Sequence, residues 1–323
     1  MTRVDIRRLS TPASVRDQLA LDVQNGLLSP PRRLPPRYFY DARGSALFEQ
    51  ITRLPEYYPT RAETEILEAH AADLVAVTGP EEIFELGSGP SRKTRLLLET
   101  MHAEGTGRRY VALDVSEDAI EQAALALVAD YPWLDVVGLV GDFHTDLARV
   151  PREGRRLIAF LGSTIGNLDP DERRGFLREV TGILEDGDGF LLGVDLVKDA
   201  GTLEAAYDDS AGVTAEFNLN VLRVINRELD GDIPIDAFEH VALYDKEHQW
   251  MEMRLRARRA VSARLAGIDA ELSLAPGEEI RTEISAKFTR EGITGELEDA
   301  GLNVRRWCVD AQDRFGLVLA VRP

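Results

Sequence analysis

Residues 82–95 combine residue types and spacings that suit a bound small-molecule cofactor. An apolar segment, 82–86, leads into Gly87-Ser88-Gly89, and a segment of helical character with cations at 92, 93 and 95 follows. Glycines at 87 and 89 remove the Cβ atoms that would keep a ligand away from the backbone, and the first turn of a helix offers free N–H groups. The segment therefore predicts a strand, a ligand-binding turn and a helix.

The pattern of this turn disfavours a dinucleotide. Arg92 stands where the fingerprint G-x-G-x-x-G requires its third glycine, so the sequence reads E-x-G-x-G from Glu85 instead. Lys93 could meet a carboxylate, such as that of the methionyl part of S-adenosylmethionine. Short glycine motifs also occur in turns that bind nothing, and this motif by itself leaves that alternative open.

The elements around this turn predict a doubly wound α/β domain. Runs that are apolar throughout alternate with helical spacers, and such runs are typical of parallel strands covered on both faces. Two further apolar runs near the end of the chain predict an antiparallel hairpin that completes the sheet. The parallel strands are expected at 83–86, 110–113, 136–140, 157–161 and 190–194, and the hairpin at 304–309 and 316–321.

Polar residues follow three of these strands, at the edge where such sheets bind ligands. Asp114 could accept both ribose hydroxyls, Asp142 could accept from an adenine amino group, and Phe143 could pack on the ring. Residues 162–167 follow the fourth strand and would face the reacting group. Each of these residues could instead be a helix cap or a turn residue. Their agreement with the glycine turn favours an adenosyl cofactor.

Residues 1–61 and 197–287 do not follow the strand–helix alternation and predict a second domain. A proline-rich segment, 29–36, must be extended, and aromatic residues are concentrated just after it. Met251, Met253 and Leu255 alternate as one face of a strand. Glu283 and Ser285 share a face of another strand, where they could hold a small polar ligand or simply face solvent. Before the first strand of the sheet, T-x-x-E at 60–63 predicts a capping box.

The composition excludes several classes of function. A net charge of −18 repels nucleic acid, and no apolar run approaches the roughly 18 residues of a membrane span. The five histidines lack metal-ligand spacing, so we expect no bound metal. A single cysteine, Cys308, excludes an internal disulfide and fits a reducing cytoplasm, where we expect the protein.

Three long motifs are more specific than the glycine turn. They occupy residues 38–61, 160–168 and 206–220, and with them nearly the whole chain resembles the actinobacterial L-histidine Nα-methyltransferases of ergothioneine biosynthesis. The resemblance implies S-adenosylmethionine-dependent trimethylation of the α-amino group of free histidine to hercynine. It also implies a class I methyltransferase (Rossmann-like) domain at 62–196 and 288–323, and a substrate-recognition domain of α+β type at 1–61 and 197–287.

The resemblance further implies two sets of site residues. Within the substrate set, Tyr57 and Tyr207 would hold the carboxylate, and Glu283 with Ser285 the imidazole. Asn167 and Tyr40 are the implied catalytic residues, with Asn167 on the amine and Tyr40 near the transferred methyl. The substrate contacts would be Tyr57, Asn167, Tyr207, Met253, Glu283 and Ser285, and the cofactor contacts Gly87, Lys93, Asp114, Asp142, Phe143, Gly162, Ser163 and Phe48.

These residue types suit methyl transfer from a sulfonium. The amine must be neutral and in line with the S–CH3 bond, with reacting atoms about 3 to 3.5 Å apart, so positioning does most of the work. A free α-amino group with a pKa near 8 already supplies neutral amine, and the uncharged Asn167 Oδ1 can orient N–H groups without stabilising the ammonium. Glu283 beside the imidazole would give selectivity for histidine.

Other functions remain open to the sequence. A methyltransferase of another amino acid amine, such as tryptophan, would prefer an apolar wall in place of Glu283 and Ser285. Nucleic-acid and protein N-methyltransferases more often carry Asn/Asp-Pro-Pro-aromatic after the fourth strand, whereas this chain has Asn-Leu-Asp-Pro at 167–170. A sensor that binds the nucleoside without turnover is a third alternative. We expect a monomer that acts on free histidine, with no nucleic-acid or membrane partner.

Overall fold

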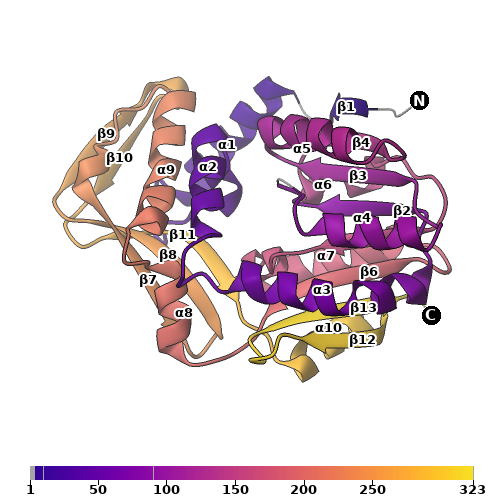
Figure 1. Ribbon diagram of the computed structural model, residues 1–323. Helices are drawn as coiled ribbons and strands as arrows, with labels where there is room; N and C mark the ends of the chain where they lie inside the picture. Colours follow the sequence, from indigo (N-terminus) through magenta and orange to yellow (C-terminus); the bar gives the residue numbers. More distant parts are fainter. Residues whose placement is uncertain (1–3, 10, 90, 323) are drawn as a thin grey trace. The chain divides into compact units, whose positions relative to one another are not determined.

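The computed structural model describes residues 4–9, 11–89 and 91–322, which form two compact units (Figure 1). Unit 1 takes in the chain up to Leu9, then Pro59–Val197, then the chain from Ala286 onward. Unit 2 takes in the two intervening segments, which end at Tyr58 and at Ser285. The chain therefore leaves unit 1 and returns to it twice.

Unit 1 is built on one eight-stranded sheet in the order β1-β4-β3-β2-β5-β6-β13-β12. The first six strands along the chain pair in parallel, and β13 pairs antiparallel with both β6 and β12. The doubly wound sheet and its terminal hairpin are thus confirmed. The strands are β1 (Val4–Arg8), β2 (Glu82–Leu86), β3 (Arg109–Asp114), β4 (Asp135–Val140), β5 (Arg156–Phe160), β6 (Gly189–Asp195), β12 (Asn303–Val309) and β13 (Phe315–Val321).

The strand order turns back between β2 and β5, and this reversal is where such sheets bind ligands. Every residue of β2, β5 and β6 is buried, which explains why these strands are mainly apolar. Helices pack on the sheet and connect its strands. They are α3 (Pro59–Thr78), α4 (Thr94–Ala103), α5 (Glu117–Asp130), α6 (Phe143–Asp146), η2 (Leu147–Arg149), η3 (Thr164–Asn167), α7 (Pro170–Ile183) and α10 (Arg290–Asp299).

Strand β1 belongs to a different domain from the one that the sequence-based boundaries gave it. We assigned residues 1–61 to the second domain, whereas Val4–Arg8 pairs in parallel with β4 at the edge of the unit 1 sheet. Four of its five residues are exposed, including Val4 and Ile6, so no buried apolar face marks it as part of this sheet. Main-chain hydrogen bonds to β4, which any sequence can make, decide its place.

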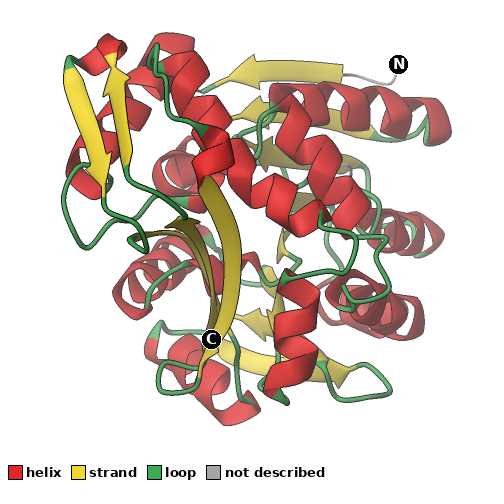
Figure 2. Cartoon of the chain, turned by 90° about the vertical axis from the view of Figure 1, so that its left-hand side faces the viewer, coloured by secondary structure: helices red, strands yellow, loops and turns green. Residues whose placement is uncertain are grey.

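Unit 2 combines helices with two small sheets, as the expected α+β class requires. Strands β7 (Phe238–Asp245), β8 (Trp250–Ala257) and β11 (Glu279–Ala286) form one sheet. Strands β9 (Val261–Leu265) and β10 (Ala270–Leu274) form an antiparallel pair, seen as the two short arrows at the upper left of Figure 2. The helices are α1 (Pro12–Gly26), η1 (Pro36–Phe39), α2 (Ala42–Ile51), α8 (Ala200–Tyr207), α9 (Val213–Glu228), η4 (Ile235–Ala237) and η5 (Ala266–Ile268).

The core of unit 2 follows the predicted alternation along β8. Met251, Met253 and Leu255 are all buried, so this prediction is confirmed. Helix α2 approaches the core closely because Gly44 has no side chain. A Cβ at Gly44 would lie 1.6 Å from the carbonyl oxygen of Phe39, and only a backbone shift could relieve that contact.

Neither a membrane span nor a metal cluster is found in the described part of the chain. No helix within residues 4–9, 11–89 and 91–322 is both long and apolar enough to cross a membrane. The same described residues contain no group of three or more His, Cys, Asp or Glu side chains that could hold a metal ion.

Candidate cofactor and substrate sites

The glycine turn after β2 has an open surface. Gly87 and Gly89 adopt positive φ angles of 63° and 47°, a region that residues with a side chain rarely enter. A Cβ built on either glycine would meet no described heavy atom within 4 Å outside its chain neighbours. The turn therefore leaves its backbone accessible to a ligand, as the sequence predicted.

Asp114, the last residue of β3, holds this turn in place. Its Oδ2 accepts from the Gly89 N–H at 2.8 Å, and its Oδ1 accepts from the Ser116 N–H at 2.9 Å. A carboxylate offers about four lone-pair sites, so capacity remains for ribose hydroxyls. The ends of β2 and β3, which are separate in sequence, are joined here as expected.

Glu85 supports the turn from inside the protein. The Tyr110 hydroxyl donates to its carboxylate, and the Tyr110 and Ser91 hydroxyl oxygens lie 2.7 Å apart. Burial raises the pKa of Glu85 to about 7, against the opposing effect of its hydrogen bonds with Thr94 and Tyr110. The glutamate of E-x-G-x-G is therefore a buried structural group, only 3% exposed.

Lys93 is joined to a residue that the sequence analysis interpreted differently. Its ammonium forms an ion pair with Glu63 of α3, whose side chain is completely buried. Helix α3 begins at Pro59, so Thr60 lies within the helix and the capping box predicted at 60–63 is wrong. The available signal was helical spacing, because Glu63 precedes the buried Ile66 and Leu67 by three and four positions.

The residues after β4 and β5 also have internal contacts. Asp142 caps α6 by accepting from the His144 N–H at 2.9 Å. The Phe143 ring lies 5.2 Å from that of Phe160, between centroids. Ser163 Oγ accepts from the Asp195 N–H at 2.9 Å. These contacts fix the positions of Asp142, Phe143 and Ser163 without testing their predicted contacts with the cofactor.

Two residues predicted to hold the substrate are in direct contact in unit 2. The Tyr207 hydroxyl, at the end of α8, donates to Ser285 Oγ of β11 at 2.7 Å. Glu283 lies two positions before Ser285 on the same strand and is half-buried. Residues from distant parts of the chain are thus assembled at one place.

A half-buried histidine that contacts Tyr207 was missed by the sequence analysis. His240 Nε2 lies 2.8 Å from the Tyr207 carbonyl oxygen, and its Nδ1 lies 2.8 Å from Asn218 Nδ2. The Thr282 hydroxyl donates to Asn218 Oδ1 at 2.6 Å, which turns the amide nitrogen of Asn218 toward the ring. Burial lowers the pKa of His240, which favours the neutral ring. In a neutral ring, the carbonyl oxygen near Nε2 and the amide nitrogen near Nδ1 favour the tautomer with its proton on Nε2. The residues come from four separate elements. Only Tyr207 and Asn218 share a motif, the one at 206–220, and no motif joins them to His240 or Thr282.

The predicted aromatic residues gather around Phe217 of α9. Tyr40 and Phe48 lie 5.5 and 5.9 Å from its ring, and Tyr57 lies 6.1 Å from Phe48, between centroids. Phe217 was not among the predicted site residues, although it stands in one of the long motifs. Met253 is 2% exposed and belongs to the core of the unit.

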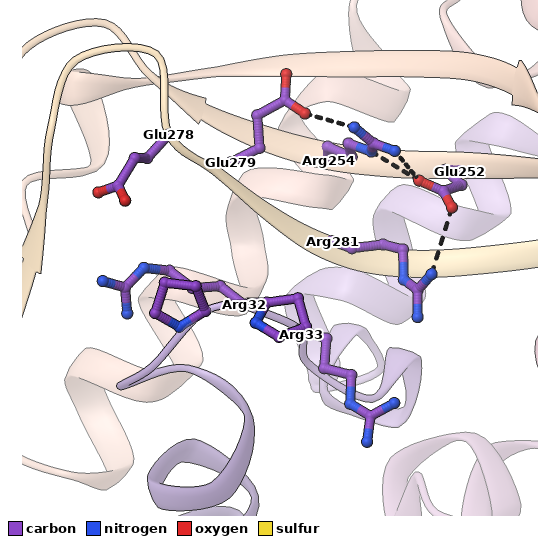
Figure 3. A pocket seen from close by; sticks show the side chains of 9 residues that line it. Arg32, Arg33, Glu252, Arg254, Glu278, Glu279 and Arg281 are labelled. Atoms are coloured by element: carbon purple, nitrogen blue, oxygen red, sulfur yellow. Dashed lines mark hydrogen bonds and ion pairs between the residues drawn. The ribbon is translucent and has the colours of Figure 1, made fainter.

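A pocket of about 430 Å³ occurs elsewhere in unit 2 and contains none of the predicted site residues (Figure 3). Its wall is strongly charged, and part of this charge is paired within the wall. Arg254 contacts Glu279 at 2.6 Å, and Arg281 contacts Glu252 at 3.3 Å. The lining residues are Pro30, Pro31, Arg32, Arg33, Glu252, Arg254, Glu278, Glu279 and Arg281.

Comparison with known proteins identifies the family. The family model of histidine-specific, S-adenosylmethionine-dependent methyltransferases matches residues 19–322. The chain belongs to this family. It is 50% identical to the histidine N-alpha-methyltransferase of Mycolicibacterium smegmatis over 96% of both chains, and 48% identical to that of Mycobacterium tuberculosis over 94% of this chain and 95% of the relative. It is also 36% identical to ergothioneine biosynthesis protein 1 of Neurospora crassa, over 99% of this chain and 36% of that protein.

Family membership makes S-adenosylmethionine the cofactor, and the structure of unit 1 fits it. This member of the histidine-specific methyltransferase family has the doubly wound class I sheet that its sequence predicts. The space over Gly87 and Gly89, which a Cβ would fill, is where a ligand can approach the backbone.

Proposed function

We propose that this methyltransferase transfers three methyl groups from S-adenosylmethionine to the α-amino group of free L-histidine and forms hercynine, the first step of ergothioneine biosynthesis. The observation that carries the proposal is the 50% identity to a histidine N-alpha-methyltransferase over 96% of both chains. The hydrogen-bonded pair of Tyr207 and Ser285 supports it, because both residues were predicted to hold the substrate.

Unit 1 is the cofactor-binding domain in this proposal. S-adenosylmethionine supplies an electrophilic methyl group on a sulfonium. The backbone at Gly87 lies against the cofactor, Asp114 accepts from the ribose hydroxyls, and Lys93 meets the carboxylate. Asp142 and Phe143 take the adenine, and Gly162 and Ser163 complete the contacts from this unit. Phe48, which belongs to unit 2, is the remaining predicted cofactor contact.

Unit 2 holds the amino acid by its two ends. Tyr57 and Tyr207 donate to the substrate carboxylate, Glu283 and Ser285 bind the imidazole, and Met253 forms part of the wall. The hydrogen bond from Tyr207 to Ser285 gives this scheme a specific consequence. When the Tyr207 hydroxyl donates to a carboxylate instead, the Ser285 hydroxyl is released toward the imidazole, so both ends of histidine are bound together.

The neutral α-amine is the nucleophile. Its lone pair forms the N–C bond as the S–C bond breaks, and the first two transfers each release one proton to solvent. The third transfer produces a quaternary ammonium, which has no proton to lose. Asn167 accepts from the amine N–H groups and orients the lone pair without stabilising the charged form, and Tyr40 lies near the transferred methyl.

An amino acid panel tests this function. Purified protein is incubated with S-adenosylmethionine and each amino acid in turn, and the products are measured by mass spectrometry. We expect trimethylated histidine as the main product. Methylation of tryptophan without histidine would replace the proposal by the nearest alternative, and cofactor binding without any turnover would favour a sensor.

The remaining expectations belong to the same proposal. The protein acts as a cytoplasmic monomer on a free amino acid and binds no nucleic acid. Light scattering after size-exclusion chromatography would test the monomer, and a filter-binding assay with DNA and RNA would test the last point.

A further inference from the structure

Glu63 is a buried carboxylate to which no function has been assigned. It lies in the second turn of α3, and its side chain is completely buried. It contacts two residues of the predicted cofactor set that follow different strands. Its carboxylate pairs with the Lys93 ammonium, and both of its oxygens accept from the Gly162 N–H, at 2.8 and 3.0 Å.

A glycine on the sheet leaves the room that this carboxylate occupies. A Cβ at Gly193 of β6 would lie 2.1 Å from Glu63 Oε1. A Cβ at Gly162, which has a φ of 75°, would lie 3.6 Å from Lys93 Nζ. Helix α3, the start of α4, the segment after β5 and strand β6 therefore all meet at the Glu63 carboxylate.

The charges of Glu63 and Lys93 explain why these two side chains are held together. A buried carboxylate is strongly unfavourable unless it is paired and hydrogen-bonded, and here both conditions are met. The Lys93 side chain is 22% exposed, so it is partly accessible to a ligand while the buried Glu63 holds its ammonium from within. An ammonium has three donors, so Lys93 can contact a ligand carboxylate while it remains bonded to Glu63.

We propose that Glu63 is a positioning residue of the cofactor site, which fixes the Lys93 ammonium and the Gly162 backbone so that they receive the aminocarboxylate end of S-adenosylmethionine. This inference rests on the proposed cofactor site. Glu63 acts through Lys93 and Gly162, and it does not itself contact the cofactor.

This role predicts how the loss of Glu63 changes the binding affinity of two forms of the cofactor. S-adenosylmethionine and its product S-adenosylhomocysteine share the aminocarboxylate end, and only the former carries the sulfonium charge. Loss of Glu63 should therefore weaken both to the same extent. A direct attraction between Glu63 and the sulfonium would weaken S-adenosylmethionine alone.

The first test is Glu63→Gln, which keeps the size of the side chain and removes its charge. Isothermal titration calorimetry should show about tenfold weaker binding of both cofactor forms, as expected for a lost charge-assisted hydrogen bond. The KM for S-adenosylmethionine should rise to the same extent, while the KM for histidine stays within about twofold. Glu68→Gln, at an exposed position of the same helix, is the matched control and should leave both affinities unchanged.

Gly193→Ala tests the same arrangement from the other side and keeps the Glu63 charge. Its methyl group should displace the carboxylate and weaken both cofactor forms, whereas Gly175→Ala should not, because a Cβ there meets no described heavy atom within 4 Å. If Glu63→Gln does not fold, the affinities of Gly193→Ala for the two cofactor forms test the proposal instead.

The outcomes separate this inference from the function that it rests on. Wild-type protein that binds no S-adenosylmethionine would refute the proposed function itself. Wild-type binding with unchanged or tighter binding in both variants would overturn the positioning role. Weakening of S-adenosylmethionine alone would overturn it in favour of direct attraction to the sulfonium.

Discussion

The two units hold their candidate residues by different means. In unit 1 the candidate cofactor site is centred on backbone, with an open glycine turn braced by Asp114 and by the buried Glu85. In unit 2 the substrate residues depend on side-chain contacts, such as the hydrogen bond from Tyr207 to Ser285 and the contact of His240 with Tyr207. A site made from backbone leaves a short motif in the sequence, whereas a site made from side-chain contacts leaves only scattered residues.

The glycines show the same difference. At Gly89 a Cβ would meet no described heavy atom within 4 Å, so a side chain there would conflict with a ligand. At Gly44 a Cβ would lie 1.6 Å from the Phe39 carbonyl oxygen, so a side chain there would conflict with the fold. Gly44 therefore serves packing in unit 2, whereas the open surroundings of Gly89 suit the binding role proposed for the turn in unit 1.

The largest expected effect is on the packed glycine. Gly44→Ala should destabilise the protein by about 3 to 5 kcal/mol, because only a shift of the backbone can relieve the contact with Phe39. Thermal unfolding of the variant measures this loss. Gly175→Ala, an exposed helical position with no described heavy atom within 4 Å of the added Cβ, is the control and should be neutral or slightly stabilising. Equal stability of the two variants would contradict the packing role of Gly44.

The next effect is on cofactor binding. Gly89→Val should weaken S-adenosylmethionine about 100-fold, which is about 2.7 kcal/mol, because the side chain occupies the ligand space. It should also destabilise the fold by about 2 kcal/mol through the positive φ. Gly105→Val is a close control, since Gly105 has a φ of 69° and equally open surroundings. It should show the same loss of stability without loss of affinity, and equal affinities of the two variants would remove the turn from the site.

A smaller effect separates the substrate site from the cofactor site. Glu283→Ala should weaken histidine binding about 30-fold, about 2 kcal/mol, because the imidazole loses a charged hydrogen-bond partner. Binding of S-adenosylmethionine should change by less than about twofold. Calorimetry with each ligand measures both affinities, and Glu271→Ala, exposed on β10, is the control in the same unit. Equal loss of both ligands would refute the imidazole role of Glu283.

The smallest effect concerns pH. Burial raises the pKa of Glu85 from 4.5 to about 7, so the folded protein keeps a proton that the unfolded chain releases in this range. The resulting stabilisation is full below about pH 4.5 and is lost as the pH rises through about 7. Relative to Glu85→Gln, the wild type should therefore lose about 1 to 3 kcal/mol of stability between pH 5 and 8, measured by thermal unfolding.

His240 in unit 2 should show the opposite trend. Burial lowers its pKa from 6.5, so the stability that it contributes is present above pH 6.5 and is lost as the pH falls below that value. Comparison of the wild type with His240→Gln over the same pH range tests this. The stability of the wild type relative to Glu85→Gln should fall as the pH rises, and its stability relative to His240→Gln should rise. If both differences changed in the same direction, the contrast between the units would be contradicted.

Sequence reasoning succeeded for the sheet because its signal is local. The buried strands of unit 1 are mainly apolar runs, and the turns and helices between them follow in order. It failed for β1, whose mostly exposed side chains carry no such signal, and whose place depends on main-chain bonds to β4. It failed for Glu63 because a plausible local cap competed with the helical spacing that places this residue on the buried face of α3. No local pattern reveals its long-range contact with Gly162.

The sequence by itself determined the doubly wound fold, the family and the glycine turn, since periodicity, long motifs and backbone requirements are written in consecutive residues. Only the tertiary structure decided which polar groups meet. It joined Glu63 to Lys93 and Gly162, and Tyr207 to Ser285 and His240. The physical reason is that buried charges and hydroxyls must find partners, and those partners lie on elements far apart along the chain.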